Sequence, residues 1–82
     1  MDRVFVYIIQ SIVEPARYYS GLTSNATSRL EVHNSGGSRH TAQFRPWRLI
    51  ACVEFVSESS AARFEKYLKT GSGRAFAKRH FV

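Results

Sequence analysis

The side chains best suited to catalysis in this sequence are two tyrosines, an arginine, a histidine and a glutamate: Tyr7, Tyr19, Arg29, His33 and Glu65. This set suits hydrolysis of a phosphodiester bond. A divalent ion held by the carboxylate would polarise the phosphate, the arginine would stabilise developing charge, and a base would activate water. The ordinary pKa of tyrosine is about 10, so a phenol serves as that base only beside a metal ion, a lysine or an imidazole. The six acidic residues are spread along the chain, which favours one metal ion over a two-metal cluster.

Other catalytic chemistries lack their residues here. One cysteine and three scattered histidines do not provide zinc-ligand spacing, and no glycine-rich phosphate loop or serine–histidine–acid set is visible. The glycines at 36–37 and 71–73 are interpreted as helix stops. Cys52 lies in the apolar run 49–56 and is predicted to be a small core residue in a reducing compartment.

Two runs rich in β-branched and aromatic residues, 2–10 and 17–22, flank a break at Glu14 and Pro15. This pattern predicts a β-hairpin. Gly21 lies near the end of the second run. A glycine there has no side chain to pack, so we expect it to mark a close approach of another backbone or a ligand.

The register of this hairpin decides how the tyrosines meet. With Ile9 opposite Arg17, Tyr7 lies opposite Tyr19, and their β-carbons are about 5 Å apart on one face of the sheet. The alternative interpretation is two half-buried tyrosines with a purely structural role.

A helix is predicted over residues 26–34, with its cap at 24–25 and Leu30 as its main anchor. Arg29 and His33 are four residues apart and therefore share one flank of this helix, beside the leucine. The alternative is an exposed arginine and a histidine at the boundary of the core.

Residues 38–47 form a polar segment in which positive charge alternates with the rings of Phe44 and Trp47. Such a segment suits a phosphate backbone with unstacked bases, or else its rings plug the end of the core. The following run, 48–56, is apolar on both faces except at Glu54. It is predicted to be a third strand, covered on both sides and central or nearly so.

A second helix is predicted from a cap at Ser57 to a stop at Gly71. Its apolar stripe consists of Ala61, Phe64 and Leu68. Glu65 lies inside this stripe, where a carboxylate is costly unless it is paired or bound to metal. We interpret Glu65 as a metal or substrate ligand, with a buried salt bridge to Arg29 as the alternative.

A short third helix over residues 73–80, capped by Ser72 and packed through Phe76, is predicted to follow. Half of the twelve basic residues fall between Arg63 and Arg79, against one acid. One side of the molecule should therefore be strongly positive. With a net charge of +6, this field favours nucleic acid over a membrane as partner.

The length of 82 residues predicts one domain, residues 1–82. No run of about 18 apolar residues and no charged-then-apolar leader is present, so we expect a soluble, unexported, cytoplasmic protein.

Several stretches, in order along the chain, resemble the motifs of the GIY-YIG nuclease superfamily. The resemblance is to its small stand-alone members, related to the N-terminal domain of the excision-repair nuclease subunit. The two motifs that give the family its name resemble Phe5-Val6-Tyr7 and Tyr19-Ser20-Gly21; they keep the tyrosines, lack the first glycine and carry serine for isoleucine. The remaining matching stretches are 29–36, 45–47, 64–69 and 71–74.

The resemblance implies an α+β fold, a small three-stranded antiparallel sheet flanked by about three helices. It also implies divalent-metal-dependent nicking of DNA with one Mg²⁺ or Mn²⁺ ion. In this reading Glu65 is the metal ligand, Arg29 steadies the scissile phosphate, Tyr7 and Tyr19 position or activate water, and His33 is a proton partner.

The predicted nucleic-acid contacts are Arg39, Arg45, Lys66, Lys69, Arg74 and Lys78. RNA in place of DNA, and a protein partner that supplies specificity, stay open. Ala77 stands where many relatives carry an active-site asparagine. The alternative function is a basic nucleic-acid-binding module without cleavage activity of its own, but retention of both tyrosines, Arg29 and Glu65 favours the nuclease.

Overall fold

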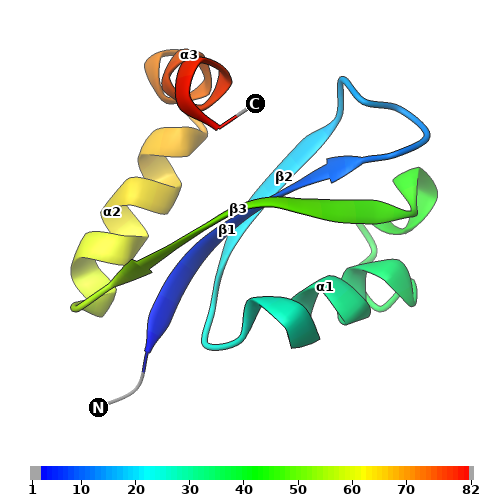
Figure 1. Cartoon of the computed structure of the whole chain (residues 1–82), viewed down its shortest axis with the longest axis horizontal. Helices are drawn as coiled ribbons and strands as arrows, with labels where there is room; N and C mark the ends of the chain where they lie inside the picture. Colours follow the sequence, from blue (N-terminus) through cyan, green and yellow to red (C-terminus); the bar gives the residue numbers. More distant parts are fainter. Residues whose placement is uncertain (1–2, 82) are drawn as a thin grey trace.

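The computed structural model describes residues 3–81. In chain order its elements are β1 (Val4–Ser11), β2 (Tyr18–Thr23), α1 (Ala26–Asn34), a 3-10 helix η1 (Ala42–Phe44), β3 (Trp47–Phe55), α2 (Glu58–Leu68) and α3 (Gly71–His80). The strands form one antiparallel sheet in the order β2-β1-β3, with α1 on one side of it and α2 and α3 on the other (Figure 1). The predicted α+β fold is confirmed.

The central strand β1 supplies both halves of the core, because successive side chains of a strand point to opposite faces. Val6 and Ile8 pack with Ala61 and Leu68 of α2. Tyr7 and Ile9 face the other way and pack with Trp47, and Leu30 of α1 lies against them. Leu30 therefore anchors α1 to the core, as predicted.

The prediction that the third strand is central is wrong. β3 pairs with β1 alone among the described residues and forms an edge of the sheet, and Leu49, Cys52 and Glu54 on it are exposed. The Asn34 side chain, at the end of α1, hydrogen-bonds the backbone N–H and the backbone carbonyl of Trp47, at the start of β3. α1 therefore covers the start of β3 and leaves the later residues on the same face of the sheet exposed. Cys52 is consequently a surface thiol and not the predicted core residue.

The hairpin register also differs from the prediction. Tyr7 pairs with Gly21, and Tyr19 pairs with Ile9. The turn is as long as expected but lies one residue later in the chain, at residues 12–17, and it closes with a hydrogen bond from Ser11 N to the Arg17 carbonyl, 3.0 Å. A shift of two residues keeps each side chain on its predicted face, so the two tyrosines still share one side of the sheet. Asp2, part of the predicted first strand, lies outside the described residues.

Side-chain caps set where the helices begin. Asn25 Oδ1 accepts from Ser28 N in α1, and Ser57 Oγ accepts from Ser60 N in α2, as predicted. The predicted start of the third helix is wrong. Thr70, rather than Ser72, caps α3, so the helix begins at Gly71.

The glycines of this stretch are therefore part of α3 and do not stop a helix. Gly73 is buried in the first turn, and a β-carbon there would collide with the Tyr67 carbonyl of α2. The two helices meet so closely at this point that glycine is required.

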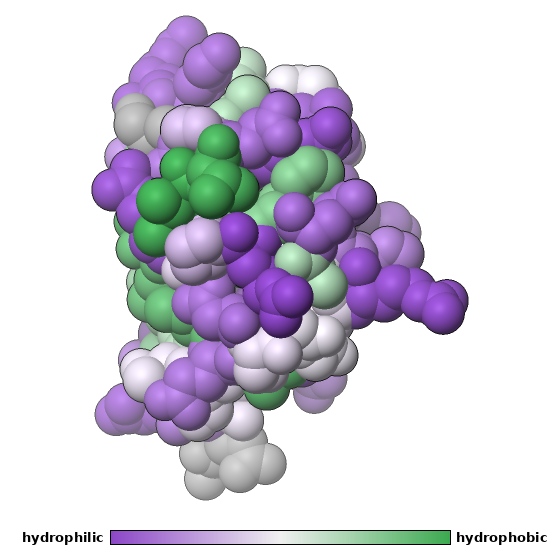
Figure 2. All heavy atoms as spheres, turned by 90° about the vertical axis from the view of Figure 1, so that its right-hand side faces the viewer, coloured by the Kyte–Doolittle hydropathy of each residue, from purple (hydrophilic) through white to green (hydrophobic). Residues whose placement is uncertain are grey.

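The surface around the β1–β2 turn mixes apolar and hydrophilic residues. Figure 2, which views this end of the molecule, shows apolar atoms gathered in a patch bordered by hydrophilic side chains. Ile12 and Val13 of the turn are 53% and 64% exposed. No helix within residues 3–81 is both long and apolar enough to span a bilayer.

Candidate active site

Three of the predicted catalytic side chains form one aromatic cluster on the α1 side of the sheet. The ring centroids of Tyr7 and Tyr19 lie 6.4 Å apart, and that of His33 lies 5.8 Å from Tyr7 and 5.1 Å from Tyr19. β1, β2 and α1 each contribute one member. The expectation of two phenols together on one face is confirmed.

His33 is fully buried, which contradicts the alternative of a histidine at the core boundary. Its Nε2 lies 2.8 Å from the Tyr7 phenolic oxygen, and its Nδ1 lies 2.7 Å from Thr41 Oγ1. The Thr41 hydroxyl has the Ser38 carbonyl as its second neighbour, at 3.4 Å. A carbonyl can only accept, so the Thr41 hydroxyl donates to Ser38 and accepts from His33 Nδ1–H. His33 Nε2 is then free to accept the phenolic hydrogen of Tyr7.

Burial controls the protonation of this pair. It lowers the pKa of His33, and the positive charge of Arg29 lowers it further, so the imidazole is neutral near pH 7. Burial also raises the pKa of Tyr7, against the opposing effect of Arg29, while negative charge on Tyr19 or Glu65 adds to the rise. Tyr7 is therefore a protonated phenol that faces a neutral base.

Arg29 extends along the same flank of α1 as His33 and lies beside the Tyr7 phenol. Its Nε is buried without a hydrogen-bond partner in the described chain. A buried donor of this kind costs free energy unless an acceptor arrives. The guanidinium thus has capacity left for an anionic ligand beside the two tyrosines.

Glu65 lies on the predicted apolar stripe of α2, and its side chain is 16% exposed. It does not pair with Arg29, the predicted alternative; its ion-pair partner is Lys69, whose Nζ is 2.5 Å from Oε2. The ammonium does not approach that oxygen in hydrogen-bonding geometry, and Oε2 is otherwise buried without a partner among the described residues. Negative charge on Glu65 adds only weakly to the raised pKa of Tyr7, so the carboxylate lies within electrostatic range of the phenol without contacting it.

Gly21 explains how Tyr7 reaches the edge of β2. A β-carbon at this position would lie 2.7 Å from the Tyr7 phenolic oxygen. The close approach predicted from this glycine exists, but the approaching group is the Tyr7 side chain and not a ligand or another backbone. Any larger residue would push the phenol away from His33.

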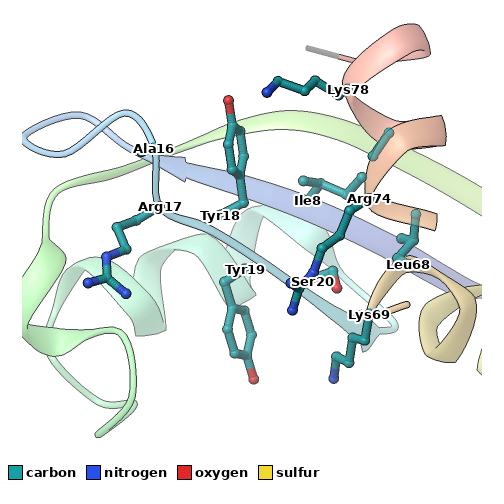
Figure 3. Close-up of a pocket in the computed structure, with 11 residues that line it drawn as sticks. Ile8, Ala16, Arg17, Tyr18, Tyr19, Ser20, Leu68, Lys69, Arg74 and Lys78 are labelled. Carbon is teal, nitrogen blue, oxygen red and sulfur yellow. The ribbon is translucent and has the colours of Figure 1, made fainter. Parts of the chain in front are cut away.

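The predicted nucleic-acid contacts divide into two groups. Lys69, Arg74 and Lys78 line one groove between β2 and the α2–α3 pair (Figure 3). The remaining three, Arg39, Arg45 and Lys66, are exposed residues that do not line this groove.

The aromatic rings of the segment 38–47 pack in the core. Trp47 is buried, with its Nε1 donating to the Thr41 carbonyl at 2.8 Å, and Phe44 packs against the same cluster. The structure thus supports the interpretation in which these two rings plug the end of the core.

Two residues around the site were not singled out from the sequence. Thr41 orients His33, and no local pattern marks it, because its effect arises only when η1 folds back over α1. Tyr18 lines the groove beside Arg74 and Lys78, and it follows a basic residue, Arg17. Arg17 and Tyr18 thus place a positive charge next to an aromatic ring, which is the same pattern that predicts nucleic-acid contact in the segment 38–47.

A model of the GIY-YIG catalytic domain matches residues 3–79 of this sequence. The chain belongs to the GIY-YIG nuclease family. The family resemblance expected from the motifs is confirmed.

Among its relatives, the structure-specific endonuclease subunit SLX1 of Scheffersomyces stipitis is 42% identical over 73% of this chain and 20% of that protein. SLX1 of Candida dubliniensis is 37% identical over 92% of the chain and 27% of that protein. The chain thus spans about a quarter or less of the length of these relatives. The solution NMR structure of the UPF0213 protein BH0048 from Bacillus halodurans superposes with a TM-score of 0.56 and 31% identity, covering 93% of this chain and 80% of that one.

Proposed function

We propose that this GIY-YIG domain is a divalent-metal-dependent endonuclease that nicks DNA, and that it selects substrates by structure more than by sequence. The observation that carries the proposal is the buried Tyr7–His33–Thr41 chain of hydrogen bonds, which opens beside Arg29. A phenol coupled to a neutral imidazole next to a spare cation suits activation of water beside a phosphate. The name of the SLX1 relatives, a structure-specific endonuclease subunit, supports the substrate class and a protein partner that adds specificity.

The proton path follows from the hydrogen bonds. A proton from the attacking water passes to the Tyr7 oxygen while the Tyr7 proton passes to His33 Nε2. His33 becomes an imidazolium whose Nδ1–H remains bonded to Thr41 Oγ1. No free phenolate accumulates, so the raised pKa of Tyr7 does not prevent the reaction.

Tyr19 and Arg29 complete the site around the reacting phosphate. The ring of Tyr19 packs against both Tyr7 and His33 and limits access of bulk water to the relay. The unpartnered Nε of Arg29 can donate to a phosphate oxygen, where a charge-assisted bond offsets the negative charge that grows in the transition state.

Glu65 fits the role of the predicted ligand for one Mg²⁺ or Mn²⁺ ion. Its Oε2 is buried without a hydrogen bond, and no group of three or more His, Cys, Asp or Glu side chains that could hold a metal gathers within residues 3–81. Magnesium commonly binds proteins through one or two carboxylates, with waters and substrate phosphates completing its shell. When bound, the ion would polarise the phosphate and stabilise developing charge. Lys69 would then release the carboxylate.

Nicking of supercoiled and branched DNA tests this function. Purified protein is incubated with magnesium, manganese or chelator, beside Glu65→Gln and Tyr7→Phe. We expect metal-dependent nicks in the wild type and a loss of roughly a hundredfold or more in both variants. Tyr67→Phe, which alters a tyrosine of α2 away from the cluster, is the matched control and should nick normally.

The opposite result points to the second function class. If the wild type retards DNA in a gel but leaves it intact with every metal, the chain is a basic binding module. Glu65→Gln should then leave binding of DNA unchanged.

A further inference from the structure

A second feature lies on the opposite side of β2 from the catalytic cluster. A groove of about 660 Å³ runs between this strand and the α2–α3 pair (Figure 3). Buried Ile8 and Leu68, together with Ala77, give it an apolar floor, and the side chains of Lys69, Arg74 and Lys78 supply positive charge along its wall. No acidic residue within the described range 3–81 lines it.

Tyr18 gives this groove an aromatic surface. Its side chain is on the opposite side of β2 from that of Tyr19, as alternation along a strand requires (Figure 3). The residue is 43% exposed, and its phenolic oxygen accepts from Gln10 Nε2 at 3.1 Å. Gln10 is itself held by the Pro15 carbonyl at 2.8 Å. The ring is therefore fixed in place while much of it remains accessible.

The groove adjoins the proposed catalytic site. Tyr19, the next residue along β2, has its ring 5.1 Å from His33 while also contributing to the groove lining. Lys69 lines the groove and pairs with Glu65. In Figure 3, Arg74 extends from α3 toward Ser20, one residue before Gly21. A strand held at Glu65 and Arg29 would thus continue into this groove.

We propose that this groove binds an unpaired nucleic-acid strand, with a base stacked on Tyr18 and phosphates contacted by Lys69, Arg74 and Lys78. Aromatic side chains stack only on bases whose faces are free, and in a duplex those faces are already covered by neighbouring bases. The apolar floor suits bases and sugars, and the cations suit the backbone. This inference rests on the proposed function for the direction in which the strand leaves the catalytic site, and it assigns structure selectivity to a single-stranded segment next to the scissile bond.

Fluorescence anisotropy tests the stacking role of Tyr18. A labelled oligothymidylate and a duplex of equal length are titrated with the protein in chelator, so that cleavage does not interfere. We expect Tyr18→Leu to weaken binding of the single strand by about five- to a hundredfold while duplex binding changes little. Tyr18→Phe keeps the ring and should bind like the wild type. Unchanged affinity of Tyr18→Leu would overturn the proposal, and so would equal losses in Tyr18→Leu and Tyr18→Phe, which would trace the effect to the Gln10 contact.

Two neighbouring cations of α3 test the charge contribution. Lys78 lines the groove, whereas Arg79 is exposed and does not line it. Lys78→Gln and Arg79→Gln remove the same charge, but only Lys78→Gln should weaken single-strand binding and lower the slope of log affinity against log salt by about one phosphate contact. Equal effects of both substitutions would show that general charge, and not this groove, attracts the strand.

The two proposals fail separately. If Tyr18 supports single-strand binding but the protein never nicks DNA, the groove proposal stands and the nuclease proposal fails. A chain that nicks DNA and binds single strands equally well with Tyr18→Leu refutes the groove alone.

Discussion

Tyr7 and His33 are joined by a 2.8 Å hydrogen bond between two side chains that are 1% and 0% exposed. The bond connects the central strand to α1 across 26 positions of sequence. Because both side chains are almost fully shielded from bulk solvent, the position of their shared proton depends on the neighbouring groups that the fold supplies. These neighbours are Thr41 on the far side of the imidazole and Arg29 beside the phenol.

Removing the Thr41 hydroxyl should disturb the proton path without touching a reacting atom. In Thr41→Val, His33 Nδ1–H loses its acceptor, so the Nε2–H tautomer becomes competitive and can no longer accept from Tyr7. We expect the nicking rate to fall by about tenfold or more. Nitrogen NMR of the imidazole reports the tautomer directly. Thr41→Ser, which keeps the hydroxyl, should retain both the rate and the wild-type spectrum, and a fully active Thr41→Val would rule out this role.

Acid should destabilise the fold through His33. Its pKa is lowered in the folded state, so as the pH falls below the ordinary value of about 6.5 the unfolded chain takes up the proton first. The free energy of unfolding should therefore decrease as the pH falls from about 7 through the lowered folded-state pKa. Urea unfolding at a series of pH values measures this slope.

A matched pair of histidine variants assigns the slope. His33→Gln should flatten it, whereas His40→Gln, at an exposed position, should leave it as in the wild type. A slope that survives in His33→Gln belongs to other groups.

Gly21→Ala should damage activity more than stability. The added β-carbon would lie 2.7 Å from the Tyr7 phenolic oxygen, at the end of a side chain that can yield by a small rotation. That rotation moves the phenol away from His33 Nε2, so we expect a drop in nicking rate of about tenfold or more with a cost of roughly 1–3 kcal/mol. The nicking assay and thermal unfolding separate the two effects. Loss of stability with normal activity per folded molecule would contradict this account.

Two glycines in the first turn of α3 should respond in opposite ways to alanine. A β-carbon at Gly73 collides with the Tyr67 carbonyl, which is backbone and cannot move aside cheaply, whereas nothing lies within 4 Å of one at Gly71. We expect Gly73→Ala to cost about 2 kcal/mol or more, and Gly71→Ala to be neutral or stabilising by up to about 1 kcal/mol. Denaturant titration of both variants decides this. Similar stabilities would show that α2 and α3 do not meet as closely as the structure has it.

Local chemistry made much of this fold predictable from the sequence. The cap at Asn25, the cap at Ser57 and the alternation along β1 depend on neighbouring residues, and the structure confirms all three. The hairpin register was wrong by two residues, yet the shared face of Tyr7 and Tyr19 survived because strand side chains repeat every two positions.

The features that the sequence did not predict depend on contacts between residues far apart in the chain. β3 is as apolar as a central strand, and only its single neighbour shows that it forms an edge. The burial of His33 arises where η1 and β1 close over α1. The pairing of Glu65 with Lys69, by contrast, has the helical spacing of four residues and was open to prediction.

Because β2 is an edge strand, it can detach locally and disrupt the catalytic geometry while the rest of the fold stays intact. β2 is bonded to β1 along one side, while the β1–β3 pairing does not depend on it. A local opening that frees β2 would carry Tyr19 and Gly21 away from Tyr7 and leave the remaining sheet intact. Edge segments of this kind open at lower free energy than a protein's core. Amide hydrogens of residues 18–23 should therefore exchange sooner than those of β1, and their protection should rise when a nucleic-acid strand bridges β2 and α3.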